Sequence, residues 1–400
     1  MSEGTGSIRS IEWTELFPWL MLFRAFGLST SIPILFLATI GVCLTPLGWM
    51  GADSLFLSDS DREGPLGATI ALHRSWPAQT QVYSGDPDTD FHLPTSCSEF
   101  LSPTWQVFAS YVTPFRQLVR EDLTAREFAY FSMGAVWNLL VWAFFGGVIT
   151  RIAVMRFGRE EREGFLDAIR YVARRFLSFF TAPLFPLVGV ALVVLLSYPV
   201  GLCLNSDVGI LIAAILWFFV LLGGLILTIL LLGLLLGWPL MWGTLSSEEL
   251  GDVFEAAQRS YSFTFSRPFH YAFYATVILT LGSGAFLFVH LFSESVLYLS
   301  EWAVSRGWGS GSPGALESNG SEIRELGVAL IGRLNDLVVT IASAFRFSFF
   351  WCAVGALYLL MRRATDHTEF DNVYVPRDQA AMELPPLSTD AEGVPGVDES

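Results

Sequence analysis

VGILIAAILWFFVLLGGLILTILLLGLLLGWPLMWGTLSS, residues 208–247, is a run of 40 residues without a charged side chain. As one straight α-helix it would extend about 60 Å, whereas the hydrocarbon core of a bilayer is about 30 Å thick. Two shorter spans would need a turn near Gly223-Gly224, which leaves the first with only about 15 residues where about 20 are required. We therefore favour one tilted span over residues 210–232.

An apolar extension of this span continues to residue 242. It contains Gly237-Trp238-Pro239 and Trp242. Tryptophan prefers the boundary between membrane and water, and proline interrupts helices. The extension is therefore expected to leave the bilayer and to lie at its surface.

Five more stretches of the chain are long and apolar enough to cross a membrane. The composition agrees, because 52% of the residues are hydrophobic and only 15% are charged, against about a quarter in soluble proteins. Backbone groups in hydrocarbon must be hydrogen-bonded, which favours helices. The prediction is an all-α membrane protein, a six-helix transmembrane bundle occupying residues 28–363. Its spans are 28–49, 128–150, 182–204, 210–232, 270–292 and 337–361.

The net charge of −15 is concentrated in two segments. Residues 364–400 hold nine acids and one arginine, a net of −8, and residues 50–127 hold eleven acids and five arginines, a net of −6. Every one of the 23 basic residues is arginine, so chemistry that requires a lysine amine is excluded. Nothing in this charge pattern attracts nucleic acid.

Arginine placement predicts the orientation in the membrane. The connector 151–181 carries seven arginines and the connector 205–209 carries none, while Arg362 and Arg363 directly follow the last span. Arginine accumulates in short cytoplasmic connectors. We therefore expect both termini to be cytoplasmic and residues 50–127 and 293–336 to lie outside.

The segment 1–27 precedes the first span. Its residues 11–26, IEWTELFPWLMLFRAF, mix aromatic side chains with two acids and one arginine. Such a mixture suits a helix lying among lipid headgroups. A frayed extension of the first span explains the same pattern equally well.

Both inner connectors show amphipathic helical patterns. In residues 159–180 apolar side chains recur on one helical face, and Arg162, Arg170, Arg174 and Arg175 fall largely off it. Such a helix can lie on a leaflet and attract anionic lipid, at about 1 kcal/mol per arginine. Alternatively its apolar face packs on the spans and the arginines only set orientation. In residues 246–266 a capping box, Ser246-x-x-Glu249, precedes a second apolar stripe.

The extracytoplasmic region 50–127 is rich in Gly, Pro, Ser and Asp. We expect a small irregular loop region over residues 50–112, with a second capping box, Thr124-x-x-Glu127, starting the next span. The stretch SGDPDTDFHLP (84–94) resembles half a calcium loop but lacks its glycine and its final glutamate.

The four cysteines form no closely spaced pair, so they predict no zinc site. Cys97, Cys43 and Cys203 all fall near the outer face, so one disulfide is conceivable there. The acidic tail 364–400 is dotted with proline towards its end and is expected to be disordered.

Arg346 is the one charged side chain inside the six span cores. An arginine at mid-membrane costs about 2.5 kcal/mol or more, so it needs partners. Backbone carbonyls, boundary acids, a lipid phosphate or an anionic cargo would serve, and the side chain can instead extend to the outer surface. Asn138 is the one carboxamide within a span and can hydrogen-bond across helices.

A catalytic set does not emerge from the spans. Gly282-Ser283-Gly284 lies on the same span as His290, and no acid is placed to orient that histidine. We expect a protein that is not an enzyme, with no metal and no cofactor.

Three segments carry a resemblance: RSYSFTFSRPFHYAFY (259–274), WCAVGALYLLMRRATDHTEFDNVYVP (351–376) and RIAVMRFGREEREGFLDAIRYVARRF (151–176). Together they resemble an uncharacterised family of bacterial polytopic membrane proteins with arginine-rich amphipathic connectors. The resemblance implies a six-span inner-membrane architecture. It implies no activity and no functional residue.

Two functions follow as hypotheses. The first is a non-catalytic scaffold or lipid-associated component whose contacts with anionic membrane lipids involve Arg170, Arg174 and Arg175. The second is a permease or channel component for an anionic solute or lipid, which uses Arg346. Protein partners remain open.

Overall fold

The chain is helical throughout the described core. The computed structural model describes residues 17–58, 96–120, 123–249, 251–307 and 322–375, with Gly67, Pro94 and two short strands. Within these residues, six helices are long and apolar enough to cross a membrane, which makes this a multi-pass membrane protein and confirms the all-α prediction.

The helices and strands have the following bounds: η1 (Pro18–Leu20), α2 (Met21–Ser29), α3 (Ile32–Phe56), α6 (Cys97–Leu118), α7 (Ala125–Gly158), α8 (Phe165–Arg174), α9 (Phe176–Thr181), η2 (Ala182–Leu184), α10 (Phe185–Cys203), α11 (Asp207–Ser247), α12 (Val253–Ser266), α13 (Pro268–Ser305), α14 (Glu322–Asp366), β1 (Ser388–Thr389) and β2 (Pro395–Gly396). The two strands pair antiparallel over two residues each.

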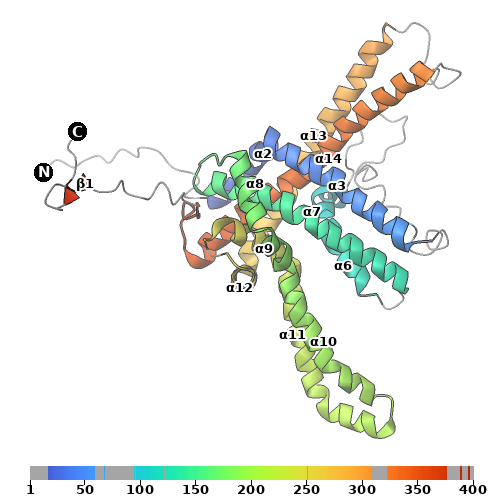
Figure 1. Ribbon diagram of the computed structural model, residues 1–400, viewed down its shortest axis with the longest axis vertical. Coiled ribbons are helices and arrows are strands. Elements are labelled where there is room, and N and C mark those ends of the chain that lie inside the picture. Colours follow the sequence, from blue (N-terminus) through green and yellow to red (C-terminus); the bar gives the residue numbers. More distant parts are fainter. Residues whose placement is uncertain are drawn as a thin grey trace.

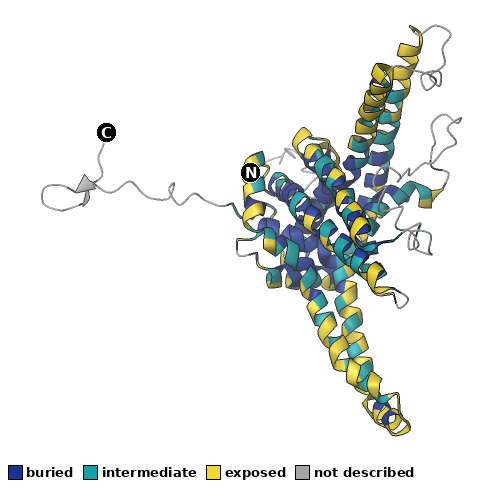
Figure 2. Ribbon diagram, turned by 45° about the vertical axis from the view of Figure 1, so that its right-hand side comes forward, coloured by how far each residue is buried: buried dark blue, intermediate teal, exposed yellow. Residues whose placement is uncertain are grey.

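The helices share one packed end and spread apart from it (Figure 1). We call this end the base. It contains α8, α9, α12, the ends of α7, α11 and α14, and the segment 367–375. Two hairpins leave the core as arms, one made of α10 with most of α11 and the other of the distal parts of α13 and α14. The arms are largely exposed, whereas the centre is buried (Figure 2).

Aromatic side chains fill the centre of the bundle, where α6, α7, α11 and α14 meet. Trp242 and Trp351 stack with ring centroids 4.4 Å apart. Tyr111 from α6 accepts a hydrogen bond from Trp351 Nε1 at 3.1 Å. Gly146 on α7 makes room for the stack, because a Cβ there would lie 2.6 Å from the Trp351 ring. This cluster packs α6, α7, α11 and α14 against one another.

A reciprocal fit joins α3 and α7. Gly48 of α3 faces the Trp137 ring of α7, and Gly134 of α7 faces the Trp49 ring of α3; a Cβ at either glycine would collide with the facing ring. The small residues therefore let two long helices approach closely, as is common between membrane helices.

Both capping predictions can be compared with the structure. The Thr124 side chain accepts from the Glu127 N–H, and the Glu127 carboxylate accepts from the Thr124 N–H at 2.8 Å, so the capping box that starts α7 is confirmed. The box at Ser246 is wrong, because α11 continues to Ser247. Asp252 caps α12 instead and accepts from the Glu255 N–H at 2.7 Å.

Residues 207–247 form one continuous helix, which excludes the two-span alternative. The expected helix break at Gly237-Trp238-Pro239 is wrong, whereas the exit of this segment from the bilayer stays a prediction. Trp238 and Trp242 are buried in the aromatic centre, and Pro239 lies inside the helix. Aromatic side chains of neighbouring helices contact both tryptophans.

Three other elements differ from expectation. Residues 97–118, expected within an irregular loop region, form α6, with Val107 and Tyr111 buried. The segment before the first span forms a separate helix, α2, which packs on α13 and α14 and is divided from α3 at Thr30-Ser31. The first span therefore begins at Ile32 rather than at residue 28. The connector 159–180 is also divided, into α8 and α9, at Arg175.

Candidate functional site: the charged base and an apolar groove

Arg151 lies at the base with its side chain fully enclosed. Its Nε donates to Glu163 at 3.0 Å, and its Nη1 donates to the carbonyls of Ser246 at 2.5 Å and Tyr374 at 2.9 Å. Its guanidinium also lies 4.1 Å from the centre of the Tyr171 ring. One arginine thus joins α7, α8, α11 and the C-terminal segment.

The electrostatics of this pair are dominated by burial. Glu163 is largely enclosed, and that burial raises its pKa above the ordinary value while Arg151 pulls in the opposite direction. Burial likewise raises the pKa of Tyr171, whose hydroxyl donates to the Leu245 carbonyl at 2.9 Å. Both groups join segments of the base, Glu163 through Arg151 and Tyr171 through the Leu245 carbonyl.

Arg175 is one of the three connector arginines expected to contact lipid, and the structure gives it a different environment. Its guanidinium donates to the carbonyls of Glu248 at 3.0 Å and Glu249 at 2.6 Å and to the Tyr171 hydroxyl at 2.9 Å. It lies where α8 ends and α9 begins. Arg175 therefore ties one connector to the other and is half-buried in doing so.

Arg170 and Arg174 lie on the exposed face of α8. Both are exposed, and Arg170 pairs at 2.9 Å with Asp167, itself exposed. Leu166 and Leu177 flank them on the same side and are 67% and 71% exposed. The opposite face holds the buried Ala168, Tyr171, Val172 and Phe179. The amphipathic pattern is thus confirmed on its buried side, and on the outer side two leucines flank the two arginines.

A second arginine cluster surrounds Glu248, at the start of the second connector. Its carboxylate accepts from Arg259 at 3.2 Å, Arg362 at 3.4 Å and the Tyr358 hydroxyl at 3.1 Å. Arg362 also donates to the carbonyls of Glu369 and Asn372. This carboxylate therefore joins α12 to α14, and Arg362 joins both to the segment that follows α14.

The C-terminal segment 367–375 folds back across the base. His367 adopts a positive φ of 55°, which reverses the chain after α14. Val373 is buried, and the Tyr374 N–H donates to the Ser247 carbonyl at 2.8 Å. Gly158 allows the close passage, because a Cβ there would lie 2.6 Å from the Phe370 carbonyl oxygen.

Arg346 is buried, with 5% of its surface exposed, so it does not extend to the lipid or to the outer surface. Its Nε donates weakly to the Ser343 carbonyl at 3.4 Å, and its guanidinium lies 5.0 Å from the centre of the Phe286 ring. The His290 ring stacks on the same Phe286, at 5.7 Å. Asn138 lies elsewhere and donates to the Ser110 carbonyl of α6 at 3.4 Å. Arg346 and His290 thus share one aromatic partner, while Asn138 joins α7 to α6.

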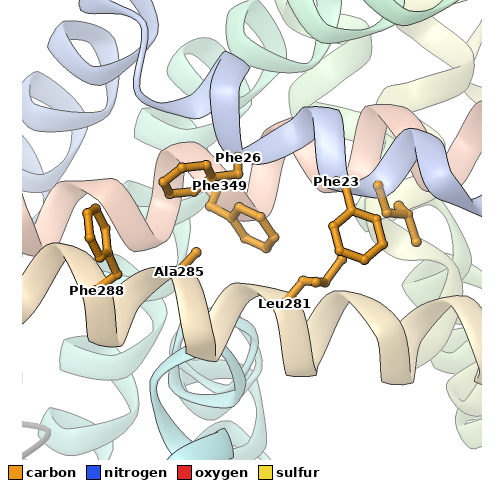
Figure 3. Close-up of a pocket in the computed structure, with 7 residues that line it drawn as sticks. Phe23, Phe26, Leu281, Ala285, Phe288 and Phe349 are labelled. Atoms are coloured by element: carbon orange, nitrogen blue, oxygen red, sulfur yellow. The ribbon is translucent and has the colours of Figure 1, made fainter.

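A groove with a volume of about 230 Å³ opens between α2 and α13, with α14 as its floor (Figure 3). Every side chain that lines it is hydrocarbon. The lining residues are Leu22, Phe23, Phe26, Leu281, Ala285, Phe288 and Phe349. Ala285 is the smallest of them, and Phe349 closes the bottom.

Metal and disulfide chemistry find no support in the described residues. No group of three His, Cys, Asp or Glu side chains there is placed to hold a metal ion. All four cysteines are free, so the conceivable disulfide of Cys97 is not formed. The calcium-like stretch 84–94 falls almost entirely outside the described residues.

No protein-family model, no curated protein and no solved structure matches the chain. The family resemblance read from the three segments is therefore supported only in its coarse form, as a helical protein with six long apolar helices.

Sequence reasoning missed the arginine network at the base and the groove. The charged residues of the base can be seen in the sequence. The partners of its arginines are mostly backbone carbonyls, however, and a sequence does not show which carbonyls will lie close to them. The groove was missed because its walls come from three helices far apart in the chain.

Proposed function

We propose that the protein is a non-catalytic, lipid-associated membrane scaffold whose base lies on an anionic, cytoplasmic leaflet. The observation that carries the proposal is the outer face of α8–α9, where Arg170 and Arg174 stand between Leu166 and Leu177. Leucine side chains on such a face enter the acyl boundary, while arginine side chains reach phosphate groups. The proposal places this face at headgroup level.

The rigid construction of the base supports a scaffold role. Three arginines donate hydrogen bonds that join the connectors and the C-terminal segment: Arg151, Arg175 and Arg362. These three arginines are therefore structural in the proposal. Arg175 belongs to this structural set, unlike the exposed Arg170 and Arg174.

The test uses the full chain, purified and examined by native mass spectrometry with bound phosphatidylglycerol or phosphatidylcholine. The double variant Arg170→Gln/Arg174→Gln should retain phosphatidylglycerol roughly 30-fold less well, because each arginine near an anionic surface contributes about 1 kcal/mol. The control is Arg306→Gln, which removes an exposed charge at the tip of α13. Equal retention by the double variant and this control would overturn the proposal.

A permease or channel component is the second candidate. The observation that favours it is the burial of Arg346 beside Phe286 and His290 within the membrane-spanning part of α14. The groove between α2 and α13 is not lined by Arg346. Anion flux into liposomes that depends on Arg346, and is lost in Arg346→Gln while the variant stays monodisperse, would favour this candidate. Flux equal to that of empty liposomes would remove it.

A further inference from the structure

We propose that the groove between α2, α13 and α14 binds one anionic phospholipid, with an acyl chain along the groove and its phosphate held at the base by Arg363, His270 and Tyr274. This site is separate from the α8 surface. It rests on the proposed lipid association but not on Arg170 or Arg174.

The groove runs along one face of α13. His270, Tyr274, Leu281, Ala285 and Phe288 are spaced by four, seven, four and three residues, so their side chains lie above one another on that face. Leu281, Ala285 and Phe288 line the groove directly. His270 and Tyr274 continue the same face towards the base.

The floor on α14 has the same continuity. Phe349, Ala356 and Arg363 recur every seven residues, so Arg363 ends the face that Phe349 begins. Arg363 lies three residues before the end of α14, and Tyr274 lies in the second turn of α13. A cation from α14 and a tyrosine from α13 therefore both lie towards the base end of the groove.

The polar groups at this end are not used by the protein. Within the described part of the chain, Arg363, His270 and the Tyr274 hydroxyl have no hydrogen bond or ion pair; their contacts are with rings. Arg363 lies over Phe370 at 4.6 Å, and the His270 and Tyr274 rings are 6.4 Å apart. Arginine in the last turn of a helix also complements the helix dipole. Complementing the helix dipole explains Arg363 but not the polar side chains of His270 and Tyr274 on α13.

The dimensions fit a lipid of the leaflet at the base. From Tyr274 to Ala285 is about 16 Å along α13, close to half of the about 30 Å of hydrocarbon. A chain anchored at Tyr274 therefore reaches mid-membrane at Ala285. Trp19 packs against Phe273 at the same lower end, where an indole ring suits the headgroup boundary.

The occupant is inferred from both ends of the site together. Hydrocarbon walls at membrane depth fit an acyl chain (Figure 3). The guanidinium, imidazole and phenol donors fit a phosphate, and no carboxylate among the described residues neutralises Arg363. An anionic headgroup balances this charge better than a zwitterionic one, which carries its own cation.

The experiment compares lipids retained by the full chain in native mass spectrometry, with phosphatidylglycerol and phosphatidylcholine of the same chains. Ala285→Phe, which fills the groove, should remove one retained lipid of either kind. Arg363→Gln should lower phosphatidylglycerol retention about fivefold and leave phosphatidylcholine unchanged. The matched control is Ala272→Phe, an exposed position on the same helix that does not line the groove.

Three outcomes decide the proposal. If Ala285→Phe retains as many lipids as Ala272→Phe, the groove does not hold an acyl chain and the proposal is overturned. If Arg363→Gln and His270→Gln leave phosphatidylglycerol retention unchanged, the headgroup assignment is overturned, and these surface variants answer that question even if Ala285→Phe misfolds. Loss in Arg170→Gln/Arg174→Gln alone would support the α8 surface and reject this site.

Discussion

Arg151 and Glu163 form a two-pronged ion pair at the base, in which Nε and Nη2 of the arginine donate to the carboxylate at 3.0 Å each. The remaining nitrogen, Nη1, donates to backbone carbonyls of Ser246 and Tyr374. The pair therefore closes the loop between α7 and α8 while it holds two distant segments. Its integrity should be measurable as stability of the whole fold.

Replacing Arg151 by Gln should destabilise the fold by about 3–5 kcal/mol, because the buried Glu163 loses its partner. Unfolding can be followed by the reactivity of Cys352, a fully buried thiol, after serine replaces the other three cysteines. Arg162→Gln, in the same connector but exposed, is the control. If the unfolding midpoint of Arg151→Gln equals that of Arg162→Gln, the ion pair contributes little to the stability of the fold.

The stability conferred by Glu163 should depend on pH in a defined direction. Burial raises its pKa above the ordinary 4.5 despite the nearby Arg151. An acid with a raised pKa contributes stability that is fully present below the unfolded value and is lost as the pH rises through the folded value. The wild type should therefore gain stability relative to Glu163→Gln as the pH falls from 7 towards 4. Parallel melting profiles across this range would contradict the assignment.

The contact between α3 and α7 should not tolerate a methyl group at its glycines. Gly48→Ala and Gly134→Ala would each force a Cβ into a tryptophan ring, Trp137 and Trp49 respectively, and overpacking of this kind costs about 1–3 kcal/mol. Gly51→Ala is the matched control, because its Cβ would meet only the end of Met133, at 4.0 Å. Melting temperatures in detergent should fall for the first two variants and stay close to wild type for the third.

The side of each connector can be tested with single cysteines. Ser206, at the tip of the α10–α11 arm, and Arg170, at the base, are both exposed. In a background without the native cysteines, Ser206→Cys and Arg170→Cys should react with a membrane-impermeant maleimide from opposite sides of the membrane. Labelling of both from the same side would mean that α10 and α11 do not cross as proposed.

The spans were predictable because hydrophobicity over about 20 residues is a local property. The capping box at Thr124 is equally local, and it was found. The burial of Trp238 and Trp242 could not be predicted from the sequence, because tryptophan suits both a membrane surface and a buried aromatic cluster. Only the partners from α6 and α14 decide between the two.

Helix α6 escaped prediction for a related reason. It contains Pro103 and Pro114 and many small polar residues, which read as a loop in isolation. Its buried Tyr111 packs against Trp238 of α11 and Trp351 of α14, so tertiary packing overrides weak local preference. At the base, the arginines bind backbone carbonyls as well as acids, and a sequence does not reveal which carbonyls will be near.

The two arms diverge from the base, so the molecule broadens towards their tips (Figures 1 and 2). The part of α11 that forms an arm, residues 207–232, is about 39 Å long and must lean by about 40° to fit within about 30 Å of hydrocarbon. A tapered protein of this kind occupies a larger area in the leaflet at its broad end than in the other leaflet. It therefore lowers the bending energy of a membrane that curves so that the leaflet at the broad end is the outer, larger one. Reconstituted molecules with their tips outward should accordingly gather in small rather than large vesicles, and an even distribution would argue that the taper is lost in a bilayer.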